Sequence, residues 1–181
     1  LVFSADGQQL AALAASGEMY VIGQDGSALS LEPHVQPNND SWTNSTLQFS
    51  PDGQSLAWVA APWVMYIYRT AGGSEADAGR LVQTFRNPLA AIRAVHLEAG
   101  EQGMLLLDEG DRVSLTEIPQ PGLYANWLSS WEGDASCPAF YAEMAGFTVD
   151  GSLTWLWQQC SGYMLLETDT GNPSGAPLPS G

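Results

Sequence analysis

Residues 49–57 read Phe-Ser-Pro-Asp-Gly-Gln-Ser-Leu-Ala, which predicts the end of one β-strand, a tight turn and the start of the next strand. In such turns Pro presets the backbone angle φ, Asp accepts hydrogen bonds from nearby amides, and Gly supplies a positive φ. Relatives of this stretch stand at 3–11 and at 147–155. The sequence therefore predicts a fold built from copies of one strand–turn–strand corner.

The spacing of these copies predicts a fourth one. Phe3 and Phe49 are 46 residues apart, whereas Phe49 and Phe147 are 98 apart. A degenerate copy is therefore expected near Leu97, and there Glu-Ala-Gly-Glu-Gln-Gly leads into an apolar run at 104–107. Repeats of roughly 40–50 residues made of strands indicate the blades of a β-propeller.

Each repeat is expected to form a small antiparallel sheet of four strands, named a to d in chain order. The expected units span residues 1–45, 46–93, 94–138 and 139–171, and a tail rich in Pro, Ser and Gly follows at 172–181. In the third unit we expect strand d at 123–128, and the tail shows no clear strand d for the fourth. The predicted fold class is all-β, with four such units as propeller blades.

The repeat resembles a known group of blades. Phe-Ser-Pro-Asp-Gly-x-x-Leu-Ala, followed by a strand and then by Met-Tyr-Ile-Tyr at 65–68, is similar to the WD40-like repeats of the TolB type. No Trp-Asp dipeptide ends a strand c and no Gly-His pair precedes a blade, which separates the chain from strict WD40 repeats. The resemblance implies a propeller that serves as a scaffold, a ligand binder or a gating domain.

The number of blades bears on the extent of the ring. Closed propellers typically have about four to eight blades, so a ring of four would be among the smallest. An open row of four would expose the apolar faces of its outer blades, which favours aggregation. We therefore interpret the chain as a segment of a larger ring.

Composition excludes some partners. The chain carries 20 acidic residues against 5 arginines and no lysine, for a net charge of −15. Such a chain repels nucleic acid and anionic lipid. No apolar run approaches the roughly 18 residues of a spanning helix. We expect membrane association only through a partner or a missing anchor.

The two cysteines form a candidate disulfide. Cys137 is expected between strand d of the third unit and strand a of the fourth, and Cys160 at the b–c turn of the fourth. These two kinds of loop emerge on the same side of a propeller, so the thiols could meet. A bridge would contribute about 3 kcal/mol and would indicate an extracytoplasmic compartment, whether periplasmic, secreted or at the cell surface. Unpaired thiols would suit the cytoplasm.

No pattern indicates catalysis, a cofactor or a metal. The chain has no Gly-x-Ser-x-Gly elbow, phosphate-binding loop or dinucleotide fingerprint. His34 and His96 lack ligand spacing with either cysteine, and His96 is expected to be structural. The acidic run at 108–111 reads as a solvated turn, and Asp6, Asp52 and Asp150 as turn residues. We expect no enzyme and no cofactor.

Four tryptophans mark a candidate protein-binding surface. Trp42, Trp63, Trp127 and Trp131 are expected in or near the d–a and b–c connections, all on one side of the blades. Exposed aromatic side chains on a rigid scaffold are typical of protein interfaces, and packing of long loops onto the blades is the alternative. We expect a protein-binding scaffold within a larger assembly. The alternatives are the regulatory propeller of a larger enzyme, such as a prolyl oligopeptidase-type serine peptidase, and a propeller that binds a small ligand or a cation.

Overall fold

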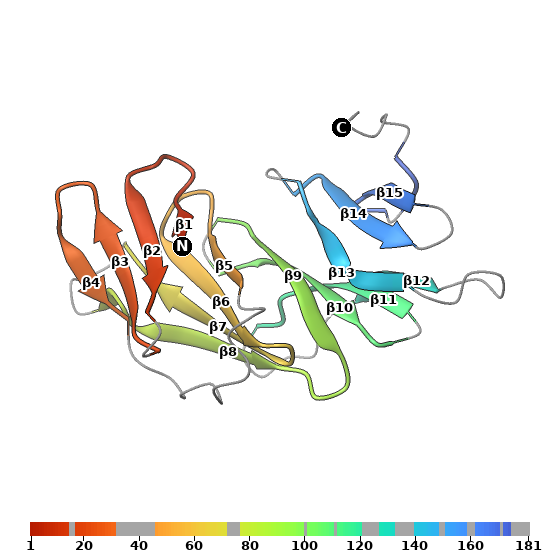
Figure 1. Cartoon of the computed structure of the whole chain (residues 1–181), viewed down its shortest axis with the longest axis horizontal. Helices are drawn as coiled ribbons and strands as arrows, with labels where there is room; N and C mark the ends of the chain where they lie inside the picture. The colour runs from red at the N-terminus through yellow and green to blue at the C-terminus, as the bar shows by residue number, and fades with distance from the viewer. Residues whose placement is uncertain are drawn as a thin grey trace. The chain divides into compact units, whose positions relative to one another are not determined.

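The structure is a computed structural model (Figure 1). It describes residues 1–14, 17–31, 46–71, 77–99, 101–110, 112–120, 127–132, 140–148, 151–158, 162–170 and 172–174. Within this part of the chain, no helix is long and apolar enough to cross a membrane.

The described residues form β-strands in four sheets, each built from strands consecutive in the chain. The first sheet has the order β1 (Val2–Phe3), β2 (Gln9–Leu13), β3 (Met19–Gly23) and β4 (Ala28–Ser30). The second has the order β5 (Thr46–Phe49), β6 (Ser55–Ala61), β7 (Val64–Arg69) and β8 (Leu81–Arg86). The third has the order β12 (Trp127–Glu132), β11 (Arg112–Glu117), β10 (Gly103–Asp108) and β9 (Ala91–Leu97). The fourth has the order β13 (Phe140–Phe147), β14 (Leu153–Gln158) and β15 (Gly162–Glu167).

The all-β prediction is confirmed, but the end of one strand was predicted too early. Strand d of the third sheet, β12, covers 127–132, so its predicted end at 128 is wrong, and the predicted residues 123–126 lie outside the described part of the chain. The apolar residues before Trp127 suggested a strand, and the two serines after Leu128 suggested its end. The strand instead continues through these serines, which pair with Leu115 and Ser114.

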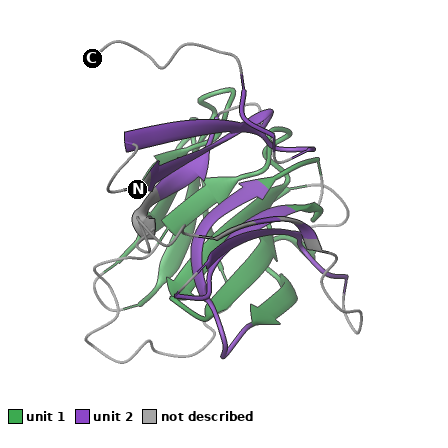
Figure 2. Cartoon of the chain, turned by 90° about the vertical axis from the view of Figure 1, so that its right-hand side faces the viewer, with its two compact units in different colours: residues 1–86, 97–103 green, residues 87–96, 104–181 purple. Residues whose placement is uncertain are grey.

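The chain divides into two compact units, shown in different colours in Figure 2. Unit 1 comprises residues 1–86 and 97–103, and unit 2 comprises residues 87–96 and 104–181. Each unit has a hydrophobic core of its own.

The core of unit 1 lies between two stacked sheets. Side chains alternate between the faces of a strand, and residues paired across strands share a face. We call the face that carries Phe3 in the first sheet, and Phe49 in the second, the front face, and the other the back face. The back face of the first sheet contributes Ala11, Met19, Val21 and Leu31 to this core. The front face of the second contributes Phe49, Leu56, Trp58, Tyr66 and Tyr68.

Unit 2 repeats this arrangement with the third and fourth sheets. One face of the third sheet contributes Met104, Leu106, Val113 and Leu115. The front face of the fourth sheet, which carries Phe147, contributes Leu156 and Leu166 together with the partly buried Ala145 and Met164. β6 and β10 are buried on both faces almost throughout, which explains their near-continuous apolar runs.

The corner between β5 and β6 shows why the repeated motif has its composition. The amide of Ser55 donates to Oγ of Ser50 (2.9 Å), and that hydroxyl donates to Oδ1 of Asp52 (2.6 Å). The same carboxylate oxygen accepts the amide of Gln54 (3.0 Å), and Gly53 has φ +67°. Ser4 and Asp6 form the same bonds in the first sheet, at 2.9, 2.6 and 3.0 Å.

The third corner lost the motif because it is one residue shorter. The amide of Glu98 bonds to the carbonyl of Gln102, four residues on. In the other three sheets the equivalent bond spans five residues, as from Ser50 to Ser55. The shorter turn cannot hold the Ser-x-Asp-Gly hydrogen bonds. Only the apolar residues of the flanking strands therefore resemble those of the other repeats.

The corner bonds predict a measurable shift at Asp6. The Ser4 hydroxyl and the Gln8 amide both donate to its carboxylate and hold the pKa of Asp6 below the ordinary value. A depressed folded-state pKa favours the folded state above the unfolded pKa of about 3.9, and this advantage is lost as the pH falls through the folded value. We expect an NMR titration to find the Asp6 pKa below that of an unfolded-chain aspartate, and Ser4→Ala to raise it.

Asp25 supplies the crossed control. Its pKa is lowered mainly by the hydroxyl of Ser27. Ser27→Ala should therefore raise the pKa of Asp25 and leave that of Asp6 unchanged. If Ser4→Ala moves neither group, or moves both alike, the corner bonds do not have the role assigned to them.

Candidate functional site

Trp63 occupies the turn between the most buried strands of unit 1. Only Pro62 and Trp63 separate the paired residues Ala61 and Val64, and a β-bulge follows Val59. β6 and β7 are buried almost throughout, whereas the indole-bearing residue Trp63 is 56% exposed. A short turn between two buried strands holds its side chains in place, so this aromatic group is presented to solvent from a rigid support.

The other three tryptophans have different settings. Trp42 lies outside the described residues. Trp127 and Trp131 belong to strand β12 rather than to a loop, and their backbones pair with Thr116 and Val113. β12 is one of the two edge strands of the third sheet, and its register with β11 shifts between Leu115 and Thr116. Of the four predicted residues, only Trp63 is seen in an exposed turn.

The predicted disulfide cannot be placed, because Cys137 and Cys160 both lie outside the described residues. His34 also lies outside them. The disulfide and the compartment that it would indicate therefore stay predictions.

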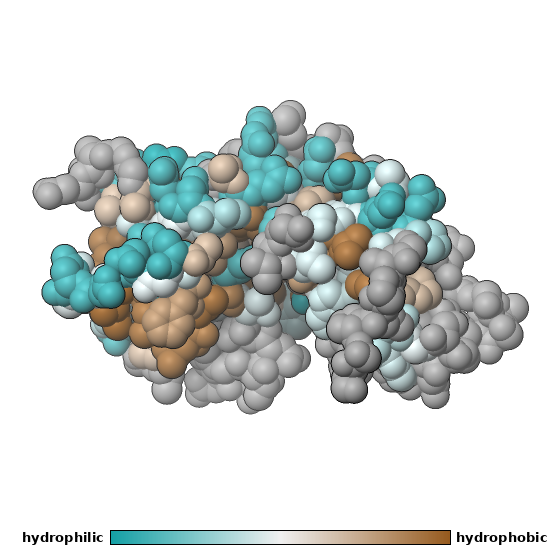
Figure 3. All heavy atoms as spheres, turned by 90° about the horizontal axis from the view of Figure 1, so that it is seen from above, coloured by the Kyte–Doolittle hydropathy of each residue, from teal (hydrophilic) through white to brown (hydrophobic). Residues whose placement is uncertain are grey.

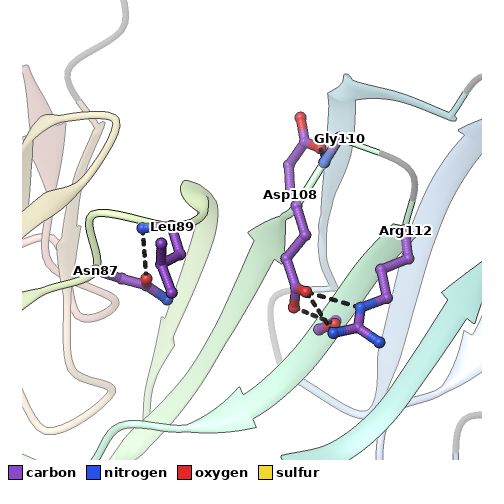
Figure 4. Close-up of polar contacts among 7 residues, drawn as sticks. Asn87, Leu89, Asp108, Gly110 and Arg112 are labelled. Atoms are coloured by element: carbon purple, nitrogen blue, oxygen red, sulfur yellow. Dashed lines mark hydrogen bonds and ion pairs between the residues drawn. The ribbon is translucent and has the colours of Figure 1, made fainter.

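Asp108 in the acidic turn is bound to an arginine. Its Oδ2 accepts hydrogen bonds from Nε and Nη2 of Arg93 at 3.0 and 2.7 Å. Its Oδ1 accepts the amide of Gly110 at 2.8 Å, as in the turn drawn in Figure 4. Both carboxylate oxygens are thus used to hold β9 and the turn after β10 together.

Glu109 is bound in the same way. Its Oε2 lies 2.7 Å from Nε and 2.6 Å from Nη2 of Arg112, and its Oε1 accepts the hydroxyl of Ser114 at 2.8 Å. In the described ranges there is no group of three or more His, Cys, Asp and Glu residues that could hold a metal ion. Asp108 and Glu109 therefore each form an ion pair with an arginine that supports the local fold.

His96 is packed into unit 2. The residue is 4% exposed, and its ring centroid lies 5.7 Å from that of Phe147. Gly151, in the corner of the fourth sheet, has φ +70°, and a Cβ there would lie 2.2 Å from Nε2 of His96. The glycine of this corner is therefore required both for its backbone angle and for the space that the imidazole fills.

A shallow pocket in unit 1 is a feature that the sequence reasoning missed. Its volume is about 180 Å³, and it is lined by Arg69, Asp77, Arg80, Leu81 and Val82. Arg69 forms an ion pair with Glu101, and Nη1 of Arg80 lies 3.8 Å from Oδ1 of Asp77. Two of the five arginines thus line one pocket, each beside a carboxylate. Nothing in the local sequence signals the ion pair beside this pocket, because Arg69 and Glu101 belong to different repeats.

The comparisons with known proteins support the fold. The β-propeller domain of Cps50 (Swd1) from Myceliophteria thermophila has a similar structure, with a TM-score of 0.57 and 17% sequence identity. The match covers 90% of this chain and 50% of that one, so the chain spans about half the length of that neighbour. No family model matches the chain. No curated protein matches it either.

The class of protein is therefore defined by its architecture. The four sheets are blades of a β-propeller with a WD40-like fold, as the repeat predicted. Three of the blades have four strands, and the fourth has three among the residues that the structure describes.

The ion pairs of the acidic turn predict indifference to calcium. We expect the melting temperature of the protein to be the same with excess Ca²⁺ and with EDTA, because the oxygens of Asp108 and Glu109 are already bound to arginine, amide and hydroxyl donors. A ligand that binds the folded state would raise the melting temperature by mass action. A clear rise with Ca²⁺, reversed by EDTA, would show a cation site that these contacts do not account for.

Proposed function

We propose that the chain is a non-enzymatic propeller scaffold that binds another protein within a larger assembly. The observation that carries this proposal is Trp63, an aromatic residue 56% exposed on a two-residue turn between buried strands. Interface residues that dominate binding energy are enriched in Trp, and a side chain held rigidly before binding loses little entropy on association.

The contact would lie at one end of the second blade. The turn that holds Trp63 follows β6, whereas the corner of Ser50, Asp52 and Gly53 precedes β6, so the two lie at opposite ends of the sheet. The corner is closed by its own hydrogen bonds, and its carboxylate and hydroxyl are used internally. We therefore assign binding to the turn end and structural support to the corner end.

The type of repeat is part of the proposal. The Ser-x-Asp-Gly corners of the first two blades support an affiliation with TolB-type repeats, since the corner chemistry explains that motif residue by residue. The chain spans about half the length of its structural neighbour, and we consider it as a segment within a longer protein. In that setting the alternative role is that of a regulatory propeller attached to an enzyme.

Removal of the exposed indole tests the proposed function. We expect Trp63→Ala to leave the far-ultraviolet circular dichroism unchanged and to weaken capture of a specific partner from native extract at least about tenfold, as for an interface hot spot. Gln54→Ala, an exposed substitution at the opposite end of the same blade, is the matched control and should capture the partner normally. The proposal is wrong if no partner is enriched over a bead control, or if both variants capture it equally well.

A further inference from the structure

One arginine of the second blade differs from the other four. Each of those four has a carboxylate within ion-pair distance: Arg69 pairs with Glu101, Arg80 with Asp77, Arg93 with Asp108 and Arg112 with Glu109. Arg86 is exposed, and no carboxylate among the described residues lies within ion-pair distance of it. Its guanidinium is thus open to a binding partner, in a chain where acidic residues outnumber arginines 20 to 5.

Arg86 lies at the same end of its sheet as Trp63. It is the last residue of β8, and register places it directly opposite Val64, the residue that follows Trp63. Residues directly opposite on antiparallel strands have Cβ atoms about 4.5–5.5 Å apart. An exposed ring and an exposed guanidinium are therefore presented from neighbouring backbone positions, so one segment of a partner can contact both. We call this end of the second blade, with Trp63 and Arg86, the Trp63 end.

The two described carboxylates of the second blade lie at its other end. Asp52 is in the corner before β6, and Asp77 is in the connection from β7 to β8, beside Arg80. The sequence has the same bias, because residues 53–97 contain four arginines against two acidic residues. The rest of the chain contains one arginine against 18 acidic residues. The Trp63 end therefore presents positive charge on a chain that is strongly negative elsewhere.

The apolar surface over the first sheet has no such charge. Figure 3 shows apolar side chains gathered there at the left of the view, where Leu1, Phe3 and Ile22 are exposed. Residues 1–31 contain no arginine and no lysine. That surface offers apolar contact alone. The Trp63 end combines apolar contact with a charge that selects one class of partner.

Two classes of macromolecule carry negative charge together with groups that pack on an indole, namely acidic peptides and nucleic acids. A nucleic acid spreads its phosphates along its whole length and would bring many of them against a chain of net charge −15. A short acidic segment brings few charges, and exposed charges farther away than roughly 8 Å are largely screened at physiological ionic strength. The observations therefore favour a peptide whose acidic charge is confined to a short stretch.

We propose that the Trp63 end binds a short acidic segment of a partner protein. The segment places an apolar side chain against the indole of Trp63 and a carboxylate against the guanidinium of Arg86, which donates charge-assisted hydrogen bonds to it. Trp and Arg are among the residue types enriched where a few side chains dominate the energy of an interface. This inference rests on the proposed function and adds to it the chemical class of the partner.

A peptide selection tests this class. A phage-displayed library of random short peptides is depleted on the Trp63→Ala variant and then selected on the natural chain, so that peptides bound through bulk charge are removed first. We expect the enriched peptides to carry Asp or Glu close to an apolar residue. Enriched peptides without acidic residues would overturn the inference and leave the proposed function standing. An empty selection would overturn it as well, and capture from native extract would still decide on the proposed function.

Charge reversal tests the role of Arg86 in binding one enriched peptide, measured by fluorescence anisotropy. Arg86→Glu should weaken the affinity at least about tenfold, because two carboxylates then face each other. Arg80→Glu is the matched control, since the side chain of Arg80 is 65% exposed and lies at the other end of β8. This control should bind within about twofold of the natural chain, because its charge is screened from the site. Circular dichroism of each variant verifies its fold.

A charge-swapped peptide makes the assignment specific. With Lys in place of its acidic residues, the peptide should bind the Arg86→Glu variant more tightly than the Arg80→Glu variant, which has the same net charge. If Trp63→Ala abolishes binding and Arg86→Glu leaves it unchanged, the site is right and the acidic class of partner is wrong. Binding of a single-stranded dT oligonucleotide that depends on both residues would overturn the inference in favour of nucleic acid. A dimer in sedimentation equilibrium that Arg86→Glu dissociates would overturn it in favour of a second copy of the chain.

Discussion

Front-to-back stacking of small sheets is the interaction on which the rest of this structure depends. Each strand alternates its side chains between two faces, so a sheet that is buried on both faces needs apolar side chains on both. Leu56, Tyr68 and Trp58 are buried on the front face of the second blade, and burial of a leucine side chain such as that of Leu56 contributes about 1.5–3 kcal/mol. The hydrogen bonds of the turns and corners hold the strands in the register that this contact requires.

The sequence predicted the parts of the fold that are decided locally. The Ser50–Asp52–Gly53 corner closes through bonds among residues five positions apart or fewer, so the same letters give the same geometry at Ser4 and Asp6. The degenerate corner near Leu97 was located by spacing alone, because its shortened turn needs none of those letters. The predicted end of strand β12 was wrong because Ser129 and Ser130 are held in the strand by pairing with Leu115 and Ser114, a contact between separate strands that no local pattern shows.

The candidate site was predictable only in part, since exposure is a property of packing and not of residue type. Trp63 was recognised from its place between two strands, and it is exposed there. Trp58, five residues earlier, is the same residue type and is 2% exposed, because the first blade covers it. The ion pair of Arg69 with Glu101 joins positions 32 residues apart, and no local pattern indicates such a contact. The exposure of Phe3 is a similar case, because Phe49 precedes the same corner motif and is buried.

The most direct test of this account compares one residue type at one register position in two blades. Phe49 and Phe3 precede the same corner, but Phe49 is 7% exposed and Phe3 is 67% exposed. In urea unfolding, Phe49→Ala should lower the free energy of unfolding by about 3–5 kcal/mol. Phe3→Ala should lower it by no more than about 0.5 kcal/mol, as for a surface substitution. Equal losses for the two substitutions would contradict the stacking of the second blade's front face on the first blade.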